Sequence, residues 1–506
     1  LWRLAQEILR VKRQPSRQST RLIHHAHPEY RTQCAHRETG PVLFRQLIKR
    51  GRGIRPAEAP ATTAINPLAG RCQFRLMAMV AARKMRRRIL VSSIVLREGA
   101  FGNATGLSCR ECGHVQDLGP YYACPECFGP LEISYNFPAV TRESIERGPR
   151  NIWRYKELLP VPADIEESPN LEPGFTRLLK AKNLGQTLGI DNLWVKDDST
   201  NPTHSFKDRV VACALSAARE FHSKVFACPS TGNLANAVAA AGARAGIKTV
   251  VFIPSNLEQG KQVNSAVYTD SLVAVEGNYD DVNKLASEIA GEEDGWAFVN
   301  VNVRPFYAEG SKTLGYEIAE QLGWRLPDQV VIPVASGSQL TKVDKAFQEL
   351  IKLGLVEDKP YRIFGAQATG CSPVSTAFKA GHDAIRPVKP DTIAKSLAIG
   401  NPADGIYVLD ICRRTGGAIE DVTDDEVRQG VLLLARTEGI FTETAGGTSI
   451  AVLKKLVETG QLDPELETVV INTGMGLKTI EAISDHVGVA ATIRPSYDAF
   501  AESGVV

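Results

Sequence analysis

A short polar segment at residues 201 to 209 reads NPTHSFKDR and holds a single lysine, Lys207, behind a Ser-Phe pair. A lysine in such a place is either an ordinary surface charge or an amine kept for covalent chemistry. A buried lysine loses its charge more easily than an exposed one and becomes a nucleophile. The choice between the two interpretations therefore depends on what surrounds the segment along the chain.

Short apolar runs alternate with helical stretches around this segment. The runs predict strands at 193–196, 224–229, 248–254, 271–277, 297–302, 329–335, 362–368 and 467–474. Helices are expected over 232–246, 311–323, 339–353, 424–437 and 448–459, from Ala-rich or regularly spaced apolar positions. This alternation is typical of parallel α/β architecture. The strands are too many for one small sheet, so we expect two α/β domains.

Three of the expected strands run into small polar turns. The turns read STGN at 230–233, SGSQ at 336–339 and TGMG at 473–476. Free N–H groups at a helix N-terminus bind anions, so the first turn suits a carboxylate and the second a phosphate. Ligands of parallel α/β domains bind at the carboxyl ends of the strands. One such turn is most often only structural, but three of them beside Lys207 predict a ligand site.

Four of the ten cysteines form two CxxC pairs in a short region ahead of the α/β part. They are Cys109, Cys112, Cys124 and Cys127. Four thiolates in paired turns suit a tetrahedral Zn²⁺ ion with a structural role. The alternative is four free or redox-active thiols. No signal peptide is evident, so a reducing compartment is favoured and a disulfide framework is not expected.

The 506 residues are 43% hydrophobic and 23% charged, as in a globular protein of two or three domains. Residues 1–100 hold 21 Lys and Arg against 5 Glu and no Asp, whereas the rest of the chain is acidic. This basic arm is a transit peptide, a nucleic-acid-binding tail, or sequence ahead of a true start near Met77 or Met79. In each case we expect the arm to be disordered.

The ordered set NPTHSFKDR, STGN, a Gly/Ser-rich loop and NTGMGLK resembles the pyridoxal-phosphate enzymes of fold type II, the tryptophan synthase β-like superfamily. Within that superfamily the chain resembles the threonine synthases most closely, because a zinc-ribbon-like leader precedes a G-x-T element at 174–176. The resemblance covers roughly residues 107 to 490. Four features depart from the family pattern. His204 stands where glycine is usual, and Arg177 where proline is usual. Leu234 stands where a small or hydroxylated residue is frequent, and the phosphate loop reads ASGSQ instead of a Gly/Asn-rich form.

The resemblance implies an α/β fold with two parallel-sheet domains of fold type II. We expect the basic arm over 1–100, the zinc-ribbon-like element over 101–140 and the catalytic region over 141–506. It also implies pyridoxal 5′-phosphate as the cofactor, with a structural Zn²⁺ ion as a second expected group. The sequence does not determine the oligomeric state, and a homodimer is one open alternative.

The resemblance also implies a role for each loop. Lys207 would bind the cofactor covalently and transfer protons, Asn233 would hydrogen-bond its 3′ oxygen, and Thr473 would meet the pyridine nitrogen. Ser230 and Thr231 would bind the substrate. The residues that would wrap the cofactor phosphate are Ala335, Ser336, Gly337, Ser338 and Gln339.

The implied reaction converts O-phospho-L-homoserine and water to L-threonine and phosphate, by elimination and hydration. Such a substrate needs a second phosphate site. Arg304, within 299–313, is our candidate, because a guanidinium makes forked contacts with phosphate. A solvated loop with incidental charges explains the same residues equally well. Lys261 is a weaker candidate.

Other functions stay open from the sequence alone. The nearest alternative is another fold-type-II enzyme, either a threonine or serine dehydratase or a β-replacement enzyme that makes cysteine or cysteate. A zinc-ribbon nucleic-acid-binding protein is a third possibility, but the acidic body with its ordered cofactor loops argues against it. The chain contains no run of about 18 or more apolar residues, so no membrane span is expected. We therefore expect a small-molecule substrate, no nucleic-acid or membrane partner, and a cytoplasmic enzyme, or a stromal one if the arm is a transit peptide.

Overall fold

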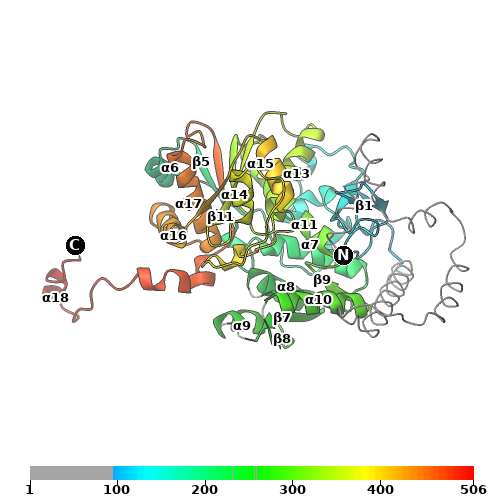
Figure 1. Ribbon diagram of the computed structural model, residues 1–506, viewed down its shortest axis with the longest axis horizontal. Helices are drawn as coiled ribbons and strands as arrows, with labels where there is room; N and C mark the ends of the chain where they lie inside the picture. The colour runs from blue at the N-terminus through cyan, green and yellow to red at the C-terminus, as the bar shows by residue number, and fades with distance from the viewer. Residues whose placement is uncertain (1–94, 231, 256, 258, 278, 506) are drawn as a thin grey trace, which may run out of the picture. The chain divides into compact units, whose positions relative to one another are not determined.

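The structure is a computed structural model that describes residues 95–505 except 231, 256, 258 and 278 (Figure 1). The expected disorder of the basic arm and the expected start near Met77 therefore fall on residues outside the described part of the chain, and so does Thr231. Within the described residues, every helix is too short or too polar to cross a bilayer.

A small antiparallel sheet precedes the α/β part. It contains β1 (Ala104–Cys109), β2 (Val115–Gln116) and β3 (Leu131–Tyr135) in the order β2-β1-β3. Leu107 and Cys109 on β1 and Ile133 on β3 are buried, because alternate side chains of a strand point to one face. We call residues 104–135 the ribbon. Its strand β3 packs against α11 (Arg304–Glu309), where Tyr135 donates a hydrogen bond of 2.6 Å to Glu309.

A four-stranded parallel sheet forms the smaller α/β domain. Its order is β8-β7-β6-β9, with β6 (Val225–Pro229), β7 (Lys248–Pro254), β8 (Leu272–Val275) and β9 (Trp296–Phe298). All five residues of β6 are buried, which is why it reads as a continuous apolar run. The helices of this domain are α8 (Asn233–Ala245), α9 (Gln259–Ala266) and α10 (Tyr279–Glu292).

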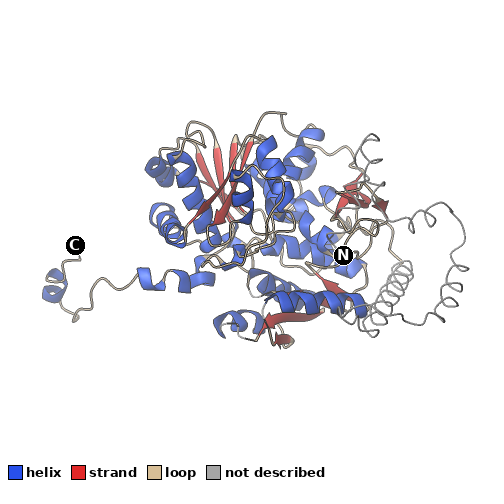
Figure 2. Cartoon of the chain, viewed as in Figure 1, coloured by secondary structure: helices blue, strands red, loops and turns tan. Residues whose placement is uncertain are grey.

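A six-stranded sheet forms the larger domain, and helices cover both of its faces (Figure 2). The strands are β12 (Ile419–Val422), β11 (Arg362–Ala368), β10 (Gln329–Pro333), β13 (Thr468–Asn472), β5 (Leu193–Asp197) and β4 (Arg177–Lys180), in that order. All pairs are parallel except β4 with β5, which are antiparallel. Strand β13 pairs with β5, so Asn472 lies opposite Asp197. The loops that follow these two strands therefore emerge side by side.

The remaining α-helices connect and cover the two sheets, except α18, none of whose residues is buried. They are α5 (Arg142–Glu146), α6 (Lys182–Leu188), α7 (Lys207–Glu220), α12 (Lys312–Gln321), α13 (Ser338–Lys352), α14 (Pro373–Lys379), α15 (Gly405–Arg414), α16 (Asp424–Glu438), α17 (Thr444–Glu458) and α18 (Tyr497–Ala501). Helices α16 and α17 pack against each other and place α17 on the large sheet.

The expectation of two parallel α/β domains is confirmed, with two strands, 248–254 and 362–368, at the expected bounds. The expected strand 297–302 is wrong beyond Phe298. There Asn302 accepts a hydrogen bond from Phe298 N at 2.8 Å and donates one to Trp296 O at 2.8 Å, which turns the chain back. Helix α7 was missed because its residues 208–218 are buried all round, so the sequence shows no amphipathic period.

A buried group of four charges fixes the start of α7. Arg209 contacts Asp198 at 2.8 Å, and it also pairs with Glu317 of α12. Lys196 of β5 lies 2.6 Å from Glu317. All four side chains are fully buried. Two positive and two negative charges balance one another, so the cluster can be buried. Its ion pairs connect β5, α7 and α12, and they fix the position of the helix that begins at Lys207.

We expect Glu317→Gln to lower the free energy of unfolding by about 3–5 kcal/mol, since it leaves buried cations uncompensated. Burial by itself raises the pKa of Glu317, but the charges of Arg209 and Lys196 outweigh it and lower the pKa to about 2. The stabilisation is therefore present above the unfolded pKa of about 4.3 and is lost as pH falls toward 2. Urea unfolding at pH 7 and at lower pH measures both effects.

The matched control is Glu458→Gln, at the exposed end of α17, where the glutamate lies 3.7 Å from Lys454. This change should stay within about 0.5 kcal/mol at every pH. Equal effects of the two substitutions at pH 7 would show that the buried cluster does not stabilise the fold.

Candidate active site

Lys207 is the first residue of α7, at the edge shared by β5 and β13. Its side chain is half-buried, and its Nζ lies 4.3 Å from the centre of the Phe206 ring. Burial lowers the pKa of Lys207 to about 8, although the carboxylate of Glu443 acts in the opposite direction. A substantial fraction of the amine is therefore neutral near pH 8, which is the nucleophilic form. The interpretation as an ordinary surface charge does not fit these surroundings.

The loop that carries Lys207 is fixed by its own hydrogen bonds. Asp208 accepts from Thr203 N at 2.8 Å and from Thr203 Oγ1 at 2.7 Å, and Phe206 N donates to Thr473 O at 2.9 Å. His204 has a φ of 61°, which lies in the left-handed region that glycine adopts most easily. This backbone conformation explains why the family pattern has glycine there. The loop is thereby held against the turn that follows β13.

Glu443 connects two residues that the sequence assigns to the cofactor. Its Oε1 accepts a hydrogen bond of 2.9 Å from Thr473 Oγ1, and its Oε2 accepts one of 2.7 Å from Asn233 Nδ2. The glutamate is 2% exposed and immediately precedes α17. Asn233 begins α8 of the smaller domain, so this contact crosses between the domains. Sequence reasoning missed Glu443; the small residues TAGG that follow it were the available signal.

The loop between β10 and α13 has the form of an anion site. Gly337 precedes α13 with a φ of 96°, and a Cβ there would lie 2.7 Å from Val408. Only glycine fits without strain. Asp404 N donates to Ser336 O at 2.8 Å, which holds the loop from outside. Because α13 has 15 residues, its N-terminal N–H groups and dipole favour a bound phosphate.

Three buried polar atoms around these loops have no hydrogen-bond partner among the described residues. They are Ser205 Oγ, Gln339 Nε2 and Thr444 Oγ1. Each comes from a different loop: ahead of Lys207, at the start of α13, and beside Glu443. An unsatisfied buried polar atom costs about 1–3 kcal/mol, so a polar ligand is expected to bind here. The set fits a phosphate and a polar ring, which is the chemistry of pyridoxal phosphate.

The residues predicted to bind the substrate lie in separate segments of the chain, and no contact between them is described. Ser230 directly follows β6 and is 8% exposed, while its predicted partner Thr231 lies outside the described residues. Arg304 begins α11, and its Nη2 lies 2.6 Å from Asp404 Oδ2. It lines a small pocket with Arg110, Glu132, Ser338 and Lys342 at the edge of the ribbon. The role of Arg304 toward a substrate phosphate stays a prediction, and the side chain of Lys261 lies outside the description.

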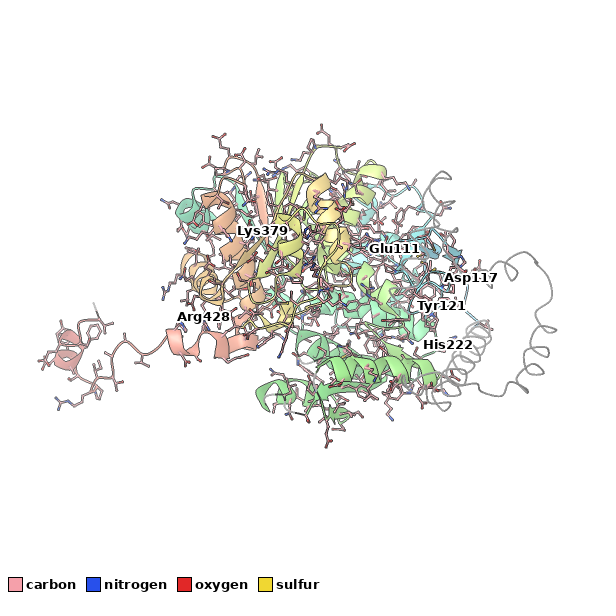
Figure 3. The ribbon with its side chains drawn as sticks, in the orientation of Figure 1. Glu111, Asp117, Tyr121, His222, Lys379 and Arg428 are labelled. Carbon is pink, nitrogen blue, oxygen red and sulfur yellow. The ribbon has the colours of Figure 1, made fainter. Side chains whose placement is uncertain are left out.

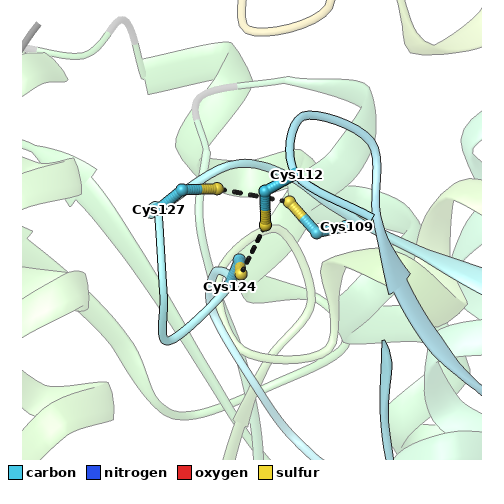
Figure 4. Close-up of side chains that lie close together, drawn as sticks. All are labelled: Cys109, Cys112, Cys124 and Cys127. Carbon is cyan, nitrogen blue, oxygen red and sulfur yellow. Dashed lines mark hydrogen bonds between the residues drawn. The ribbon is translucent and has the colours of Figure 1, made fainter. Parts of the chain in front are cut away.

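The four predicted metal ligands do come together. Their Sγ atoms all lie within 4.8 Å of one another, with 3.4 Å between Cys109 and Cys127 and 3.7 Å between Cys112 and Cys124 (Figure 4). In a tetrahedral zinc site with Zn–S bonds of about 2.3 Å, the sulfur atoms are about 3.8 Å apart. The thiols therefore fit this geometry.

The ribbon contacts the larger domain beside the cysteines. Glu111, labelled in Figure 3, accepts a short hydrogen bond from the hydroxyl of Tyr407 on α15. The guanidinium of Arg110 lies 3.4 Å from the centre of the same ring. Tyr407 follows Asp404 by three residues, and Asp404 holds Ser336. The ribbon is thus connected to the loop that precedes α13 through one short helical segment.

Comparisons with known proteins agree with this geometry. Residues 170–474 match the family described as "Pyridoxal-phosphate dependent enzyme". A threonine synthase of Methanocaldococcus jannaschii is 38% identical over 380 residues, which cover 74% of this chain and 93% of that protein. One of Methanosarcina acetivorans is 35% identical over 402 residues, covering 78% and 98%.

Two solved structures with the same fold are those of a threonine deaminase and a serine racemase. The processed threonine deaminase isoform 2 of Solanum lycopersicum aligns with a TM-score of 0.53 at 22% identity, over 63% of this chain and 86% of that one. Maize serine racemase aligns with a TM-score of 0.52 at 20% identity, over 69% and 98%. At these identities the alignments show the shared fold and no more.

We expect the amine of Lys207 to titrate near pH 8 in protein freed of cofactor, because burial disfavours its charged form. Glu443→Gln should lower this pKa further, since it removes the carboxylate that favours the ammonium. The measurement is the pH dependence of Lys207 acetylation by dilute acetic anhydride, read by peptide mass spectrometry. Glu458→Gln, at the far end of α17, is the control and should leave the midpoint unchanged. A midpoint near 10.5, or a rise with Glu443→Gln, would contradict this description.

Proposed function

The chain belongs to the pyridoxal-phosphate-dependent enzymes and, within them, to the threonine synthases, and on this basis we propose that it converts O-phospho-L-homoserine and water to L-threonine and phosphate. The observation that carries the proposal is the surroundings of Lys207. A desolvated amine with a pKa near 8 lies where α7 begins, next to Glu443, Thr473 and the unsatisfied Ser205 hydroxyl. A lysine so placed is suited to bind a carbonyl cofactor and then to move a proton.

When bound, pyridoxal phosphate supplies an electron sink next to the substrate Cα. Lys207 would hold the cofactor covalently, and its amine, once displaced by the substrate, would remove the proton at Cα. The N-terminus of α13 and Gln339 would hold the cofactor phosphate, which leaves Gln339 Nε2 satisfied. Asn233 would turn from Glu443 to the 3′ oxygen of the ring.

Glu443 determines the orientation of the Thr473 hydroxyl, which is the group expected to contact the ring nitrogen of the cofactor. A carboxylate only accepts hydrogen bonds, so the hydroxyl proton of Thr473 points at Glu443. The oxygen of Thr473 keeps its lone pairs and would be free to accept a hydrogen bond from the ring nitrogen of the bound cofactor.

The proposal is tested by incubating the protein, loaded with cofactor, with O-phospho-L-homoserine and measuring phosphate and threonine. We expect both products in equal amounts. Lys207→Ala should lose both products and the visible absorption of bound cofactor. The control is Lys182→Ala, an exposed lysine that also opens a helix, α6, and it should keep full activity. Formation of a keto acid and ammonia from threonine or serine, with no phosphate released, would instead identify a dehydratase.

We propose further that Cys109, Cys112, Cys124 and Cys127 bind one Zn²⁺ ion that stabilises the ribbon. The spacing of the sulfur atoms and the contacts of Glu111 and Arg110 with Tyr407 support a structural role, because no open ligand position is needed. The ion would hold the two CxxC turns together and, through them, the contact with α15.

Metal analysis of reduced protein should find about one zinc per chain. Cys112→Ser, which removes the exposed ligand, should lower both the zinc content and the thermal unfolding midpoint. Cys412→Ser, at a buried cysteine of α15 outside the cluster, changes the number of thiols and should leave the zinc content unchanged. Reduced protein free of metal, or a disulfide within the cluster, would rule out the zinc site.

A further inference from the structure

Lys478 is the last residue of the NTGMGLK motif, and none of the roles above uses it. It lies in a short 3-10 helix, η7 (Gly476–Ala482), directly after the turn that carries Thr473. Its side chain is half-buried, and its Nζ lies 3.1 Å from Asn236 Oδ1. Burial lowers the pKa of Lys478, and the charges of Glu443 and Asp208 act against this shift. Both of those carboxylates are neighbours of Lys207, so Lys478 lies in the same region.

Asn236 holds this lysine from the opposite domain. It lies on α8, one turn after Asn233, and it is 7% exposed. Its Nδ2 donates to Asn264 O at 2.8 Å and to Ser265 Oγ at 3.3 Å. These bonds use the amide N–H groups, so the amide oxygen faces Lys478. The orientation of the lysine is therefore set by the smaller domain.

Two parallel connections cross between the domains at this place. Asn233 contacts Glu443, and one helical turn further along α8 Asn236 contacts Lys478. On the side of the larger domain, Thr444 N donates to Thr479 Oγ1 at 3.2 Å, which ties η7 to the start of α17 beside Glu443. Lys478 thus contacts α8 one helical turn after Asn233, the residue expected to bond the 3′ oxygen of the cofactor.

The charge of Lys478 has no ion-pair partner within 4 Å among the described residues, in contrast to other cations near the site. Arg209 is paired with Asp198 and Glu317, and Arg304 is paired with Asp404. Lys478 has a neutral amide oxygen as its hydrogen-bond partner. An ammonium group has three donors, so one stays on Asn236 while the others are available. A half-buried cation with free donors favours an anion in its neighbourhood.

We propose that Lys478 binds the γ-phosphate of the substrate and that Asn236 is the positioning residue that aims it. This inference rests on the proposed function and names the residue that recognises the phosphate. During elimination the Cγ–O bond breaks and its electron pair leaves with the phosphate oxygen. A fixed ammonium next to that oxygen stabilises the growing charge. Lys478 would therefore favour phosphorylated over unphosphorylated substrates.

The test uses the full chain loaded with cofactor. Lys478→Met keeps the length of the side chain but removes its charge. We expect kcat/KM for O-phospho-L-homoserine to fall at least about tenfold, and the inhibition constant of inorganic phosphate to rise by a similar factor, as for the loss of a charge-assisted contact. The visible absorption and the affinity for pyridoxal phosphate should stay unchanged. Lys478→Arg keeps the charge and should recover part of both losses.

The control is Lys454→Met, an exposed lysine of α17 that pairs with Glu458, and it should change none of these quantities. L-serine carries no phosphate. The rate of elimination from L-serine therefore depends on the cofactor and on proton transfer, but not on recognition of a phosphate. We expect Lys478→Met to lower that activity much less than it lowers phosphate release from O-phospho-L-homoserine. An equal loss with L-serine would instead place Lys478 at the substrate carboxylate and overturn the proposal.

Two further results separate this proposal from the proposed function. If the wild-type protein releases no phosphate from O-phospho-L-homoserine, the proposed function itself fails. If the wild type is active and Lys478→Met retains the inhibition constant for inorganic phosphate, the proposal for Lys478 fails. A weakening of phosphate inhibition in Arg304→Met alone would place the substrate phosphate at Arg304 and would also overturn the proposal.

Discussion

The parallel pairing of β13 with β5 is the constraint on which the site depends. It places Asn472 opposite Asp197, and Asn472 Nδ2 donates a hydrogen bond of 2.9 Å to Asp197 Oδ1. Two loops that are far apart in the chain then emerge at one edge of the sheet, and Phe206 N bonds to Thr473 O at 2.9 Å. The buried charge cluster around Arg209 fixes the helix that follows. Lys207 is consequently held from both sides before any ligand binds.

The buried charges differ in how completely they are paired, and the difference separates structural from chemical roles. The charges of Arg209 and Lys196 balance those of Asp198 and Glu317, and they lower the pKa of Glu317 to about 2 against the effect of burial. Lys207 lacks such a partner among the described residues, so burial shifts its pKa to about 8. An amine that loses its charge readily is useful as a nucleophile, whereas a fully paired one is inert. The buried cluster around Arg209 therefore has a structural role, and Lys207 beside it is the reactive group.

The ribbon is joined to the catalytic part by charge and by ring contacts. Glu309 on α11 accepts from Tyr135 and lies 2.7 Å from Lys342 of α13, which also contacts Glu132 on β3 at 2.9 Å. On another side, Arg110 lies over the ring of Tyr407. These contacts converge on α13 and on α15, and both helices adjoin the loop at Gly337. A metal that orders the ribbon would thus also support the loop expected to hold the cofactor phosphate.

The sequence by itself determined the fold class, the three loops at strand ends, Lys207, and the four cysteines, because each is recorded in local spacing and residue type. It did not contain Glu443, which acts by bridging Asn233 and Thr473, residues 210 and 30 positions away from it. The sequence also did not reveal that Lys478 donates a hydrogen bond to Asn236, or that Arg304 is paired with Asp404. Such partnerships arise only when β5, β13 and α8 meet in space, since hydrogen bonds and burial depend on distance between atoms and not on distance along the chain.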